Sequence, residues 1–189
     1  MKLTNIKVSL KSHARSLNTV LANSSKQACS VKTYNNFIVI RFSTNKLVFT
    51  IFKNTTDDKH HINVTNLKKF QDLSLVLSCL RQLELRIIPG SIKIDNITGL
   101  IFTNIELNLS SFLTVISSLK GEFDHLSLNT SYNNERFPGM FIKFKNSSSG
   151  ERIGTAIIFH SGKIVLVGCR KISHLECLSK TMNALIRMR

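Results

Sequence analysis

The chain has 189 residues, of which 42% are hydrophobic, so it can fold as one sizeable domain or two small ones and extended disorder is excluded. Lys and Arg number 26 against 11 Asp and Glu, which gives a net charge of +15 and favours a polyanionic partner: DNA, RNA or an anionic membrane surface. No stretch reaches the ~18 apolar residues of a membrane span, no signal peptide is expected, and the cysteines lack zinc-site spacing.

Apolar and β-branched runs in the first half predict strands, and apolar residues at helical spacing predict helices. Strands are expected at 3–10, 36–42, 46–53 and 62–67, a charged turn at 55–61, and helices at 11–22 and 70–85.

The second half repeats this order. Strands are expected at 92–102, 140–145, 155–159 and 164–169, and helices at 110–119 and 173–188. Ser173, with Glu176 three residues later, predicts a capping box at the start of the last helix.

Similar segments in the two halves indicate an internal duplication. Residues 3–6 resemble 94–97, residues 50–52 resemble 157–159, and Pro89-Gly90 is a natural joint. We therefore expect an α+β fold with one repeat in 1–88 and a second in 91–189, their sheets joined on one surface and helices on the other face. A single α+β domain with accidental similarity is the alternative.

One face of each expected strand has to pack on the helices, and the other is apolar in the second half. Alternation places Ile157 and Phe159 on one face, with Val165 and Val167 on the next strand. An apolar sheet face with basic residues around it is an unusual surface to expose to solvent. It suits a minor groove, with sugars and base edges in the middle and phosphates at the rim.

Four pieces of the second half carry a resemblance to a known family, and the most specific are Phe-Pro-Gly at 137–139 and Phe-x-Ser-Gly-Lys-x-Val-x-x-Gly at 159–168. In chain order the pieces are 92–99, 131–132, 135–139 and 158–168. In order and spacing they resemble the C-terminal repeat of the TATA-box-binding protein family. The first half matches this family only in outline.

The resemblance implies a saddle: two pseudo-symmetric repeats forming a continuous curved antiparallel sheet, with helices on the convex face. It implies a transcription initiation factor that binds the minor groove of A/T-rich promoter DNA and kinks it by phenylalanine insertion.

In the second repeat the resemblance places the wedge pair on Phe137 and Phe159, and the central asparagine on Asn96. Further minor-groove contacts are expected at Thr98, Ile157, Val165 and Val167, where Val167 replaces the family's threonine. Phosphate contacts are expected at Lys143, Lys163 and Arg170.

The first repeat departs more from the pattern. Phe52 matches one wedge, and either Tyr34 substitutes for its partner or that wedge is lost. The resemblance places groove contacts on Asn5, Asn63 and Thr65 and phosphate contacts on Arg41 and Lys68, whereas Lys7 stands where the family has valine. Asymmetric bending is therefore expected.

Partners follow from the same resemblance. Glu135 alone remains of the acidic group that docks transcription factor IIB in the family, so a transcription factor IIB-like factor and the RNA polymerase machinery are expected. No cofactor, metal, membrane or small-molecule substrate is expected. The expected location is intracellular: the nucleus, or a viral transcription site in the cytoplasm, since such divergence fits a viral or fast-evolving lineage.

Other readings remain open. The phenylalanines could be core aromatics, and the same fold could serve as a protein-interaction platform or a non-specific nucleic-acid binder. No phosphate-binding loop, zinc-protease motif or nucleophile elbow occurs, so the chain is not expected to be an enzyme.

Overall fold

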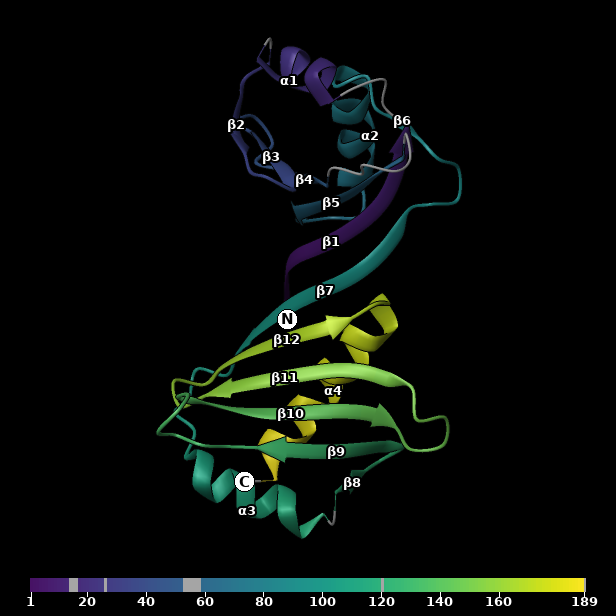
Figure 1. Cartoon of the computed structure of the whole chain (residues 1–189). Helices are drawn as coiled ribbons and strands as arrows, with labels where there is room; N and C mark the ends of the chain where they lie inside the picture. Colours follow the sequence, from purple (N-terminus) through teal and green to yellow (C-terminus); the bar gives the residue numbers. More distant parts are fainter. Residues whose placement is uncertain (14–16, 26, 53–58, 120, 189) are drawn as a thin grey trace. The chain divides into compact units, whose positions relative to one another are not determined.

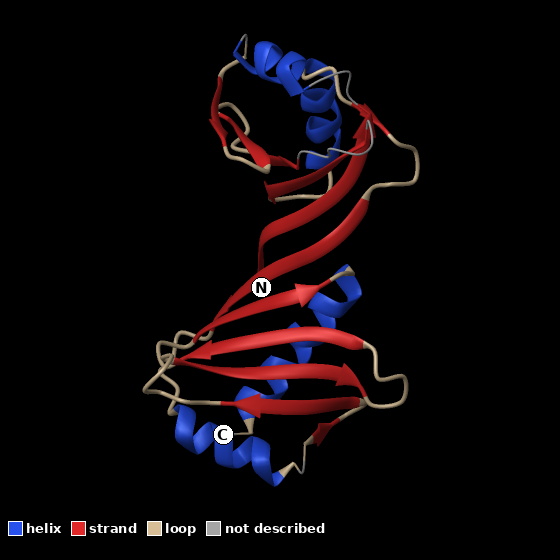
Figure 2. Ribbon diagram, in the orientation of Figure 1, coloured by secondary structure: helices blue, strands red, loops and turns tan. Residues whose placement is uncertain are grey.

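Strands and helices form two units in the computed structural model, which describes residues 1–13, 17–25, 27–52, 59–119 and 121–188. Residues 5–95 make up one unit, called the N-terminal unit below. Residues 1–4 and 96–189 make up the other, called the C-terminal unit. Each unit combines an antiparallel sheet with helices, as the sequence predicts (Figures 1 and 2).

The N-terminal unit contains most of the long first strand. Its elements are β1 Lys2–His13, α1 Leu17–Ser25, β2 Cys29–Thr33, β3 Phe37–Phe42, β4 Val48–Phe52, β5 Lys59–Leu67, α2 Asp72–Gln82 and β6 Arg86–Ile87. The strands lie in the order β2-β3-β4-β5-β1, all neighbours antiparallel, and β6 pairs with β1.

The C-terminal unit has the same kind of meander. Its elements are β7 Lys93–Phe102, α3 Leu109–Ser118, β8 Glu122–Phe123, β9 Leu126–Ser131, β10 Gly139–Asn146, β11 Arg152–Phe159, β12 Lys163–Cys169 and α4 Ile172–Arg187. The strand order is β7-β12-β11-β10-β9-β8.

Alternating aliphatic residues of the central strands face the helices and form the core of each unit. In the C-terminal unit α4 packs on β11 and β12, behind the strands in Figure 1. Its apolar stripe is fully buried together with one face of those strands: Leu175, Leu178, Met182 and Leu185 against Ala156, Ile158, Ile164 and Leu166. In the N-terminal unit α2 lies against β5, with Val76 and Leu80 buried. The helices therefore leave the opposite face of these strands uncovered.

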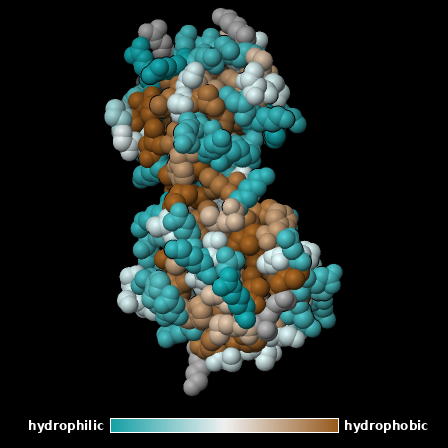
Figure 3. All heavy atoms as spheres, turned by 180° about the vertical axis from the view of Figure 1, so that it is seen from behind, coloured by the Kyte–Doolittle hydropathy of each residue, from teal (hydrophilic) through white to brown (hydrophobic). Residues whose placement is uncertain are grey.

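The reverse view of the molecule shows hydrophobic patches interrupted by hydrophilic side chains (Figure 3). Among the described residues, no helix has the length and apolar character needed to cross a membrane.

Some predicted boundaries are wrong. The helix expected at 11–22 begins only at Leu17, because β1 continues to His13 with Ser12 buried between exposed Lys11 and His13. Of the charged turn expected at 55–61, residues 59–61 belong to β5 and the rest lies outside the described residues.

Four strands, β2, β6, β8 and β9, were not predicted, and the predicted capping box is wrong. β2 and β9 are short and polar, with no buried residue in β2 and two in β9, so they carry little apolar alternation. β6 and β8 have only two residues each. The last helix is capped at Lys171, which makes no side-chain capping bond, and Ser173 lies inside the helix.

Candidate nucleic-acid interface

The exposed sheet face of the C-terminal unit is fixed by the strand register. Val165 of β12 stands opposite Leu100 of β7 and Ile157 of β11, and directly paired residues point to the same face. Buried Ile164 and Leu166 alternate with them. This face carries the predicted contacts Thr98, Ile157, Phe159, Lys163, Val165 and Val167, and the structure brings them together.

Three phenylalanine rings cluster at the turn end of this face. The ring centroid of Phe137 lies 5.8 Å from that of Phe159 and 5.0 Å from that of Phe141. A Cβ atom on Gly139 would lie 2.6 Å from Cε1 of Phe137. Glycine is therefore needed at 139 for the Phe137 ring to lie over the strand, where it is 37% exposed. The predicted pair Phe137 and Phe159 is in contact, and neither ring lies in the core.

Asn96 is held by a hydrogen bond from the backbone. The nitrogen of Gly168 donates to its Oδ1 at 2.7 Å, and its Nδ2 donates to Thr98 Oγ1 at 3.3 Å. Gly168 has φ +80°, a conformation that favours glycine. The Asn96 oxygen accepts from a backbone N–H and one amide N–H donates to Thr98, so the second amide N–H of Asn96 is the donor left for a ligand.

Asn5 of the N-terminal unit is held in the same way. Its Oδ1 accepts a hydrogen bond from the backbone nitrogen of Asn66 at 2.7 Å, and Asn66 has φ +73°. Two residues further along β1, Lys7 Nζ lies 3.6 Å from Oδ2 of Asp95, and the other carboxylate oxygen, Oδ1, accepts a hydrogen bond from Ser9 Oγ at 2.9 Å. The N-terminal face is thus more polar than the C-terminal one.

The aromatic cluster of the N-terminal unit includes a ring that was not predicted. Phe37 stacks on Tyr34, with ring centroids 4.6 Å apart, and lies 5.9 Å from Phe52. Phe52 in turn lies 5.9 Å from the ring of His61. Tyr34, 46% exposed, is therefore joined to Phe52 through Phe37. An apolar residue at the first position of a buried strand resembles a core residue, so Phe37 was overlooked.

The strand registers of the two units match position by position. The pair Phe37 and Phe52 in the N-terminal unit corresponds to the pair Gly139 and Phe159 in the C-terminal unit. In the same way, the pair Asn63 and Thr50 corresponds to the pair Val165 and Ile157. Thr65 pairs with Val48 as Val167 pairs with Thr155. Asn63 and Thr65 thus occupy the places of Val165 and Val167.

The predicted phosphate contacts also fall in matching places. Arg41 pairs with Val48 and Lys143 pairs with Thr155, at equivalent points of β3 and β10. Lys68 and Arg170 each follow the positive-φ residue, Asn66 or Gly168, by two positions. All of these cations and Lys163 are exposed. They are therefore open to contact by an anionic ligand.

The family model described as transcription factor TFIID, or TATA-binding protein (TBP), matches residues 91–188. The chain belongs to the TBP family. A solved structure, Methanococcus jannaschii TBP, matches over 100% of this chain and 98% of its own, with a TM-score of 0.67 and 21% sequence identity. At this identity the likeness shows the fold, and it confirms the predicted TBP-like saddle fold. No curated protein sequence matches.

Membership of the TBP family places the chain among DNA-binding transcription factors. The described part of this TBP-family protein contains no group of three or more metal-ligating side chains.

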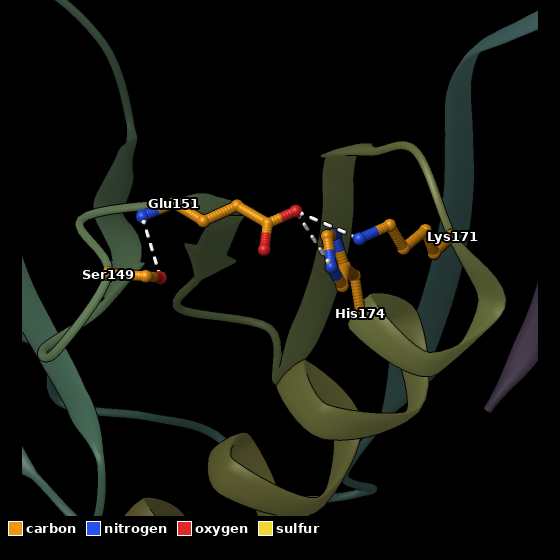
Figure 4. A network of polar contacts seen from close by, with 4 residues as sticks. All are labelled: Ser149, Glu151, Lys171 and His174. Atoms are coloured by element: carbon orange, nitrogen blue, oxygen red, sulfur yellow. Dashed lines mark hydrogen bonds and ion pairs between the residues drawn. The ribbon is translucent and has the colours of Figure 1, made fainter.

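A polar network outside the sheet face ties the β10–β11 hairpin to the start of α4 (Figure 4). A carboxylate oxygen of Glu151 lies 3.0 Å from Lys171 Nζ and 3.6 Å from His174 Nε2. The hydrogen bond and the charge of Lys171 lower the pKa of the Glu151 carboxyl. These contacts link the hairpin of the TBP-family protein to α4.

Burial raises the pKa values of three thiols in this TBP-family protein. Burial raises the pKa of Cys169 to about 11, and burial also raises the pKa values of Cys79 and Cys29. All four cysteines are free, and Cys79 and Cys169 are buried.

Proposed function

We propose that the chain is a transcription initiation factor that lays its exposed sheet faces in the minor groove of A/T-rich promoter DNA and kinks the duplex by phenylalanine insertion. Each step rests on a feature of the exposed faces.

The orientation of the two asparagines carries the proposal. The side-chain oxygens of Asn96 and Asn5 each accept a hydrogen bond from a backbone nitrogen, with an N···O distance of 2.7 Å in both cases. Both side chains therefore turn their amide nitrogens, which are donors, towards a ligand. In the minor groove A·T and T·A pairs present acceptors, adenine N3 and thymine O2, whereas G·C pairs add the guanine N2 amino donor. Donors held in place on the protein therefore favour A/T-rich sites.

The aromatic clusters support insertion at the ends of the site. Phe137 and Phe159 lie at the turn end of an apolar face, in contact with each other and partly exposed. Apolar side chains inserted between base steps unstack them and kink the duplex, most easily at flexible pyrimidine–purine steps. Phe52, with Phe37 and Tyr34, provides a second cluster, in which Tyr34 is 46% exposed.

The basic residues around the exposed sheet faces support contacts with the phosphates of the DNA backbone on both sides of the groove. Arg41, Lys143 and Lys163 project from strands, and Lys68 and Arg170 follow β5 and β12. Phosphate contacts position a protein on DNA, and their neutralisation releases counterions.

A comparison of matched duplexes tests the proposal. One duplex carries a central TATA-like run, the other the same flanks with a G/C-rich centre, and both carry dyes at their ends. We expect at least about tenfold tighter binding to the A/T duplex at moderate salt, since each mismatched position costs ~1–3 kcal/mol. We also expect a shorter end-to-end distance only for that duplex. Equal affinities for the A/T and G/C duplexes would contradict the proposal.

Domain organisation, partner and location complete the proposal. The matched registers support two repeats, in 1–88 and 91–189.

Glu135 is exposed in the turn before Phe137, where Asn133 Oδ1 accepts a hydrogen bond from the backbone nitrogen of Glu135 at 3.1 Å. We infer that this turn contacts a transcription factor IIB-like factor and the polymerase machinery. Such a factor acts inside the cell, in the nucleus or at a viral transcription site in the cytoplasm.

A second candidate is a TBP-fold platform or non-specific binder. It is favoured by the polar N-terminal face, where Lys7 is paired with Asp95 at 3.6 Å, and by Tyr34 in place of a phenylalanine. Equal binding of both duplexes with a steep salt dependence would support the non-specific binder. A flat salt response would favour a protein partner.

A further inference from the structure

An exposed aromatic ring stands apart from the clusters described above. Phe102 is the last residue of β7 and is 62% exposed, compared with 37% for Phe137. A phenylalanine left this open to water gains nothing from the core, because the burial of apolar area is what stabilises a folded chain.

The strand register places Phe102 on the exposed sheet face. It stands opposite Lys163 of β12, and two residues earlier Leu100 stands opposite Val165. Along β7, Ile97 and Ile101 are buried with the core, so the alternate residues Thr98, Leu100 and Phe102 share the other face.

The N-terminal unit carries a different residue at this place. Lys11 stands opposite His61 on β5, at the point where Phe102 stands opposite Lys163. The C-terminal face therefore gains a ring where the N-terminal face has a cation.

We propose that Phe102 is a further DNA-contact residue, whose ring packs on the deoxyribose sugars of one strand beside a phosphate bound by Lys163. This inference rests on the proposed function of the sheet face. A ring directly paired with a lysine matches the apolar sugar and the anionic phosphate that alternate along a DNA strand. The net charge of +15 favours this polyanion over a protein partner.

Phe102→Ala in the full chain tests the inference, with Phe102→Tyr as the conservative variant. Leu75→Ala is the matched control, because Leu75 is a 44% exposed apolar residue on α2, away from the sheet face. Affinity is measured on the TATA-like duplex, and hydroxyl-radical footprinting reports which sugars are covered. Thermal unfolding checks that each variant folds.

We expect Phe102→Ala to weaken binding on the order of tenfold and to lose sugar protection at one end of the footprint, while the bend is kept. Phe102→Tyr and Leu75→Ala should bind and footprint as the unchanged chain does. If Phe102→Ala binds and footprints normally while the unchanged chain still prefers A/T DNA, the inference is overturned and the proposed function stands. The inference would also be overturned if Phe102→Ala bound DNA normally and lost only its binding to a protein factor. If the unchanged chain shows no A/T preference, the proposed function itself has failed.

Discussion

The carboxamide oxygen of Asn96 accepts a hydrogen bond from the backbone nitrogen of Gly168 at 2.7 Å, and this contact determines which atom the side chain offers to a ligand. The bond joins β7 to β12 where their register shifts, between Leu166 and Cys169. The positive φ of Gly168 accompanies this irregularity, so a local feature of the backbone orients a group on the exposed face.

Asn96→Asp should weaken binding to the TATA-like duplex by tenfold or more. The carboxylate can still accept the Gly168 hydrogen bond, but it offers no donor to adenine N3 or thymine O2 and repels phosphates. Fluorescence anisotropy measures the affinity. Asn183→Asp, which makes the same charge change at an exposed site on α4, should have a much smaller effect. Equal losses in the two variants would show that only net charge matters.

Gly139→Ala should reduce bending through Phe137. The added Cβ would come within 2.6 Å of Cε1 of Phe137, so the ring has to move from its place over the strand. The dye-to-dye distance on the bent duplex measures the effect. In a double-mutant cycle, Gly139→Ala should add little once Phe137 is alanine. Additive effects of the two substitutions would argue that the glycine acts through the backbone instead.

Lys163→Ala should lower the salt dependence of DNA binding. Each phosphate contact contributes about 0.9 to the slope of log K against log salt, so the slope should flatten by about that amount. Affinity is titrated over a series of salt concentrations. Lys180→Ala removes an exposed charge from α4 and should leave the slope unchanged. An unchanged slope for Lys163→Ala would place this lysine outside the phosphate contacts.

Cys169 should react with thiol reagents only when the protein unfolds. With a pKa of about 11, about a thousandth of this thiol is ionised at pH 8, and its side chain is buried. Half-buried Cys29 should be labelled earlier. Mass spectrometry of alkylated peptides at rising denaturant gives the order of labelling. Rapid labelling of Cys169 in the native protein would contradict its burial.

The sequence predicted the C-terminal unit better than the N-terminal one, for physical reasons. Phe137 and Phe159 stand beside tight turns, which mark the strand ends and align the two rings, and the structure has them in contact. Phe102 lies at a strand end without such a marker, whereas Phe37 follows the Asn35-Asn36 turn, where the backbone nitrogen of Tyr34 donates to the oxygen of Phe37 at 2.9 Å. Alternation predicts which side of a strand a residue takes, but the register with the neighbouring strand is needed to place Phe37 beside Phe52 or Phe102 beside Lys163.

The aromatic cluster of the N-terminal unit leads to a prediction about which ring supports Phe52. Phe37 lies between Tyr34 and Phe52, with centroid distances of 4.6 and 5.9 Å, so removing it disconnects both neighbours. Phe37→Ala should therefore abolish base unstacking at one end of the site, whereas Tyr34→Phe, which keeps the stacked ring, should preserve it. The fluorescence of 2-aminopurine placed in turn at each base step measures unstacking at each end separately. Unstacking that survives Phe37→Ala but is lost in Tyr34→Ala would assign the wedge to Tyr34, and a signal unaffected by either would show that Phe52 needs no partner ring.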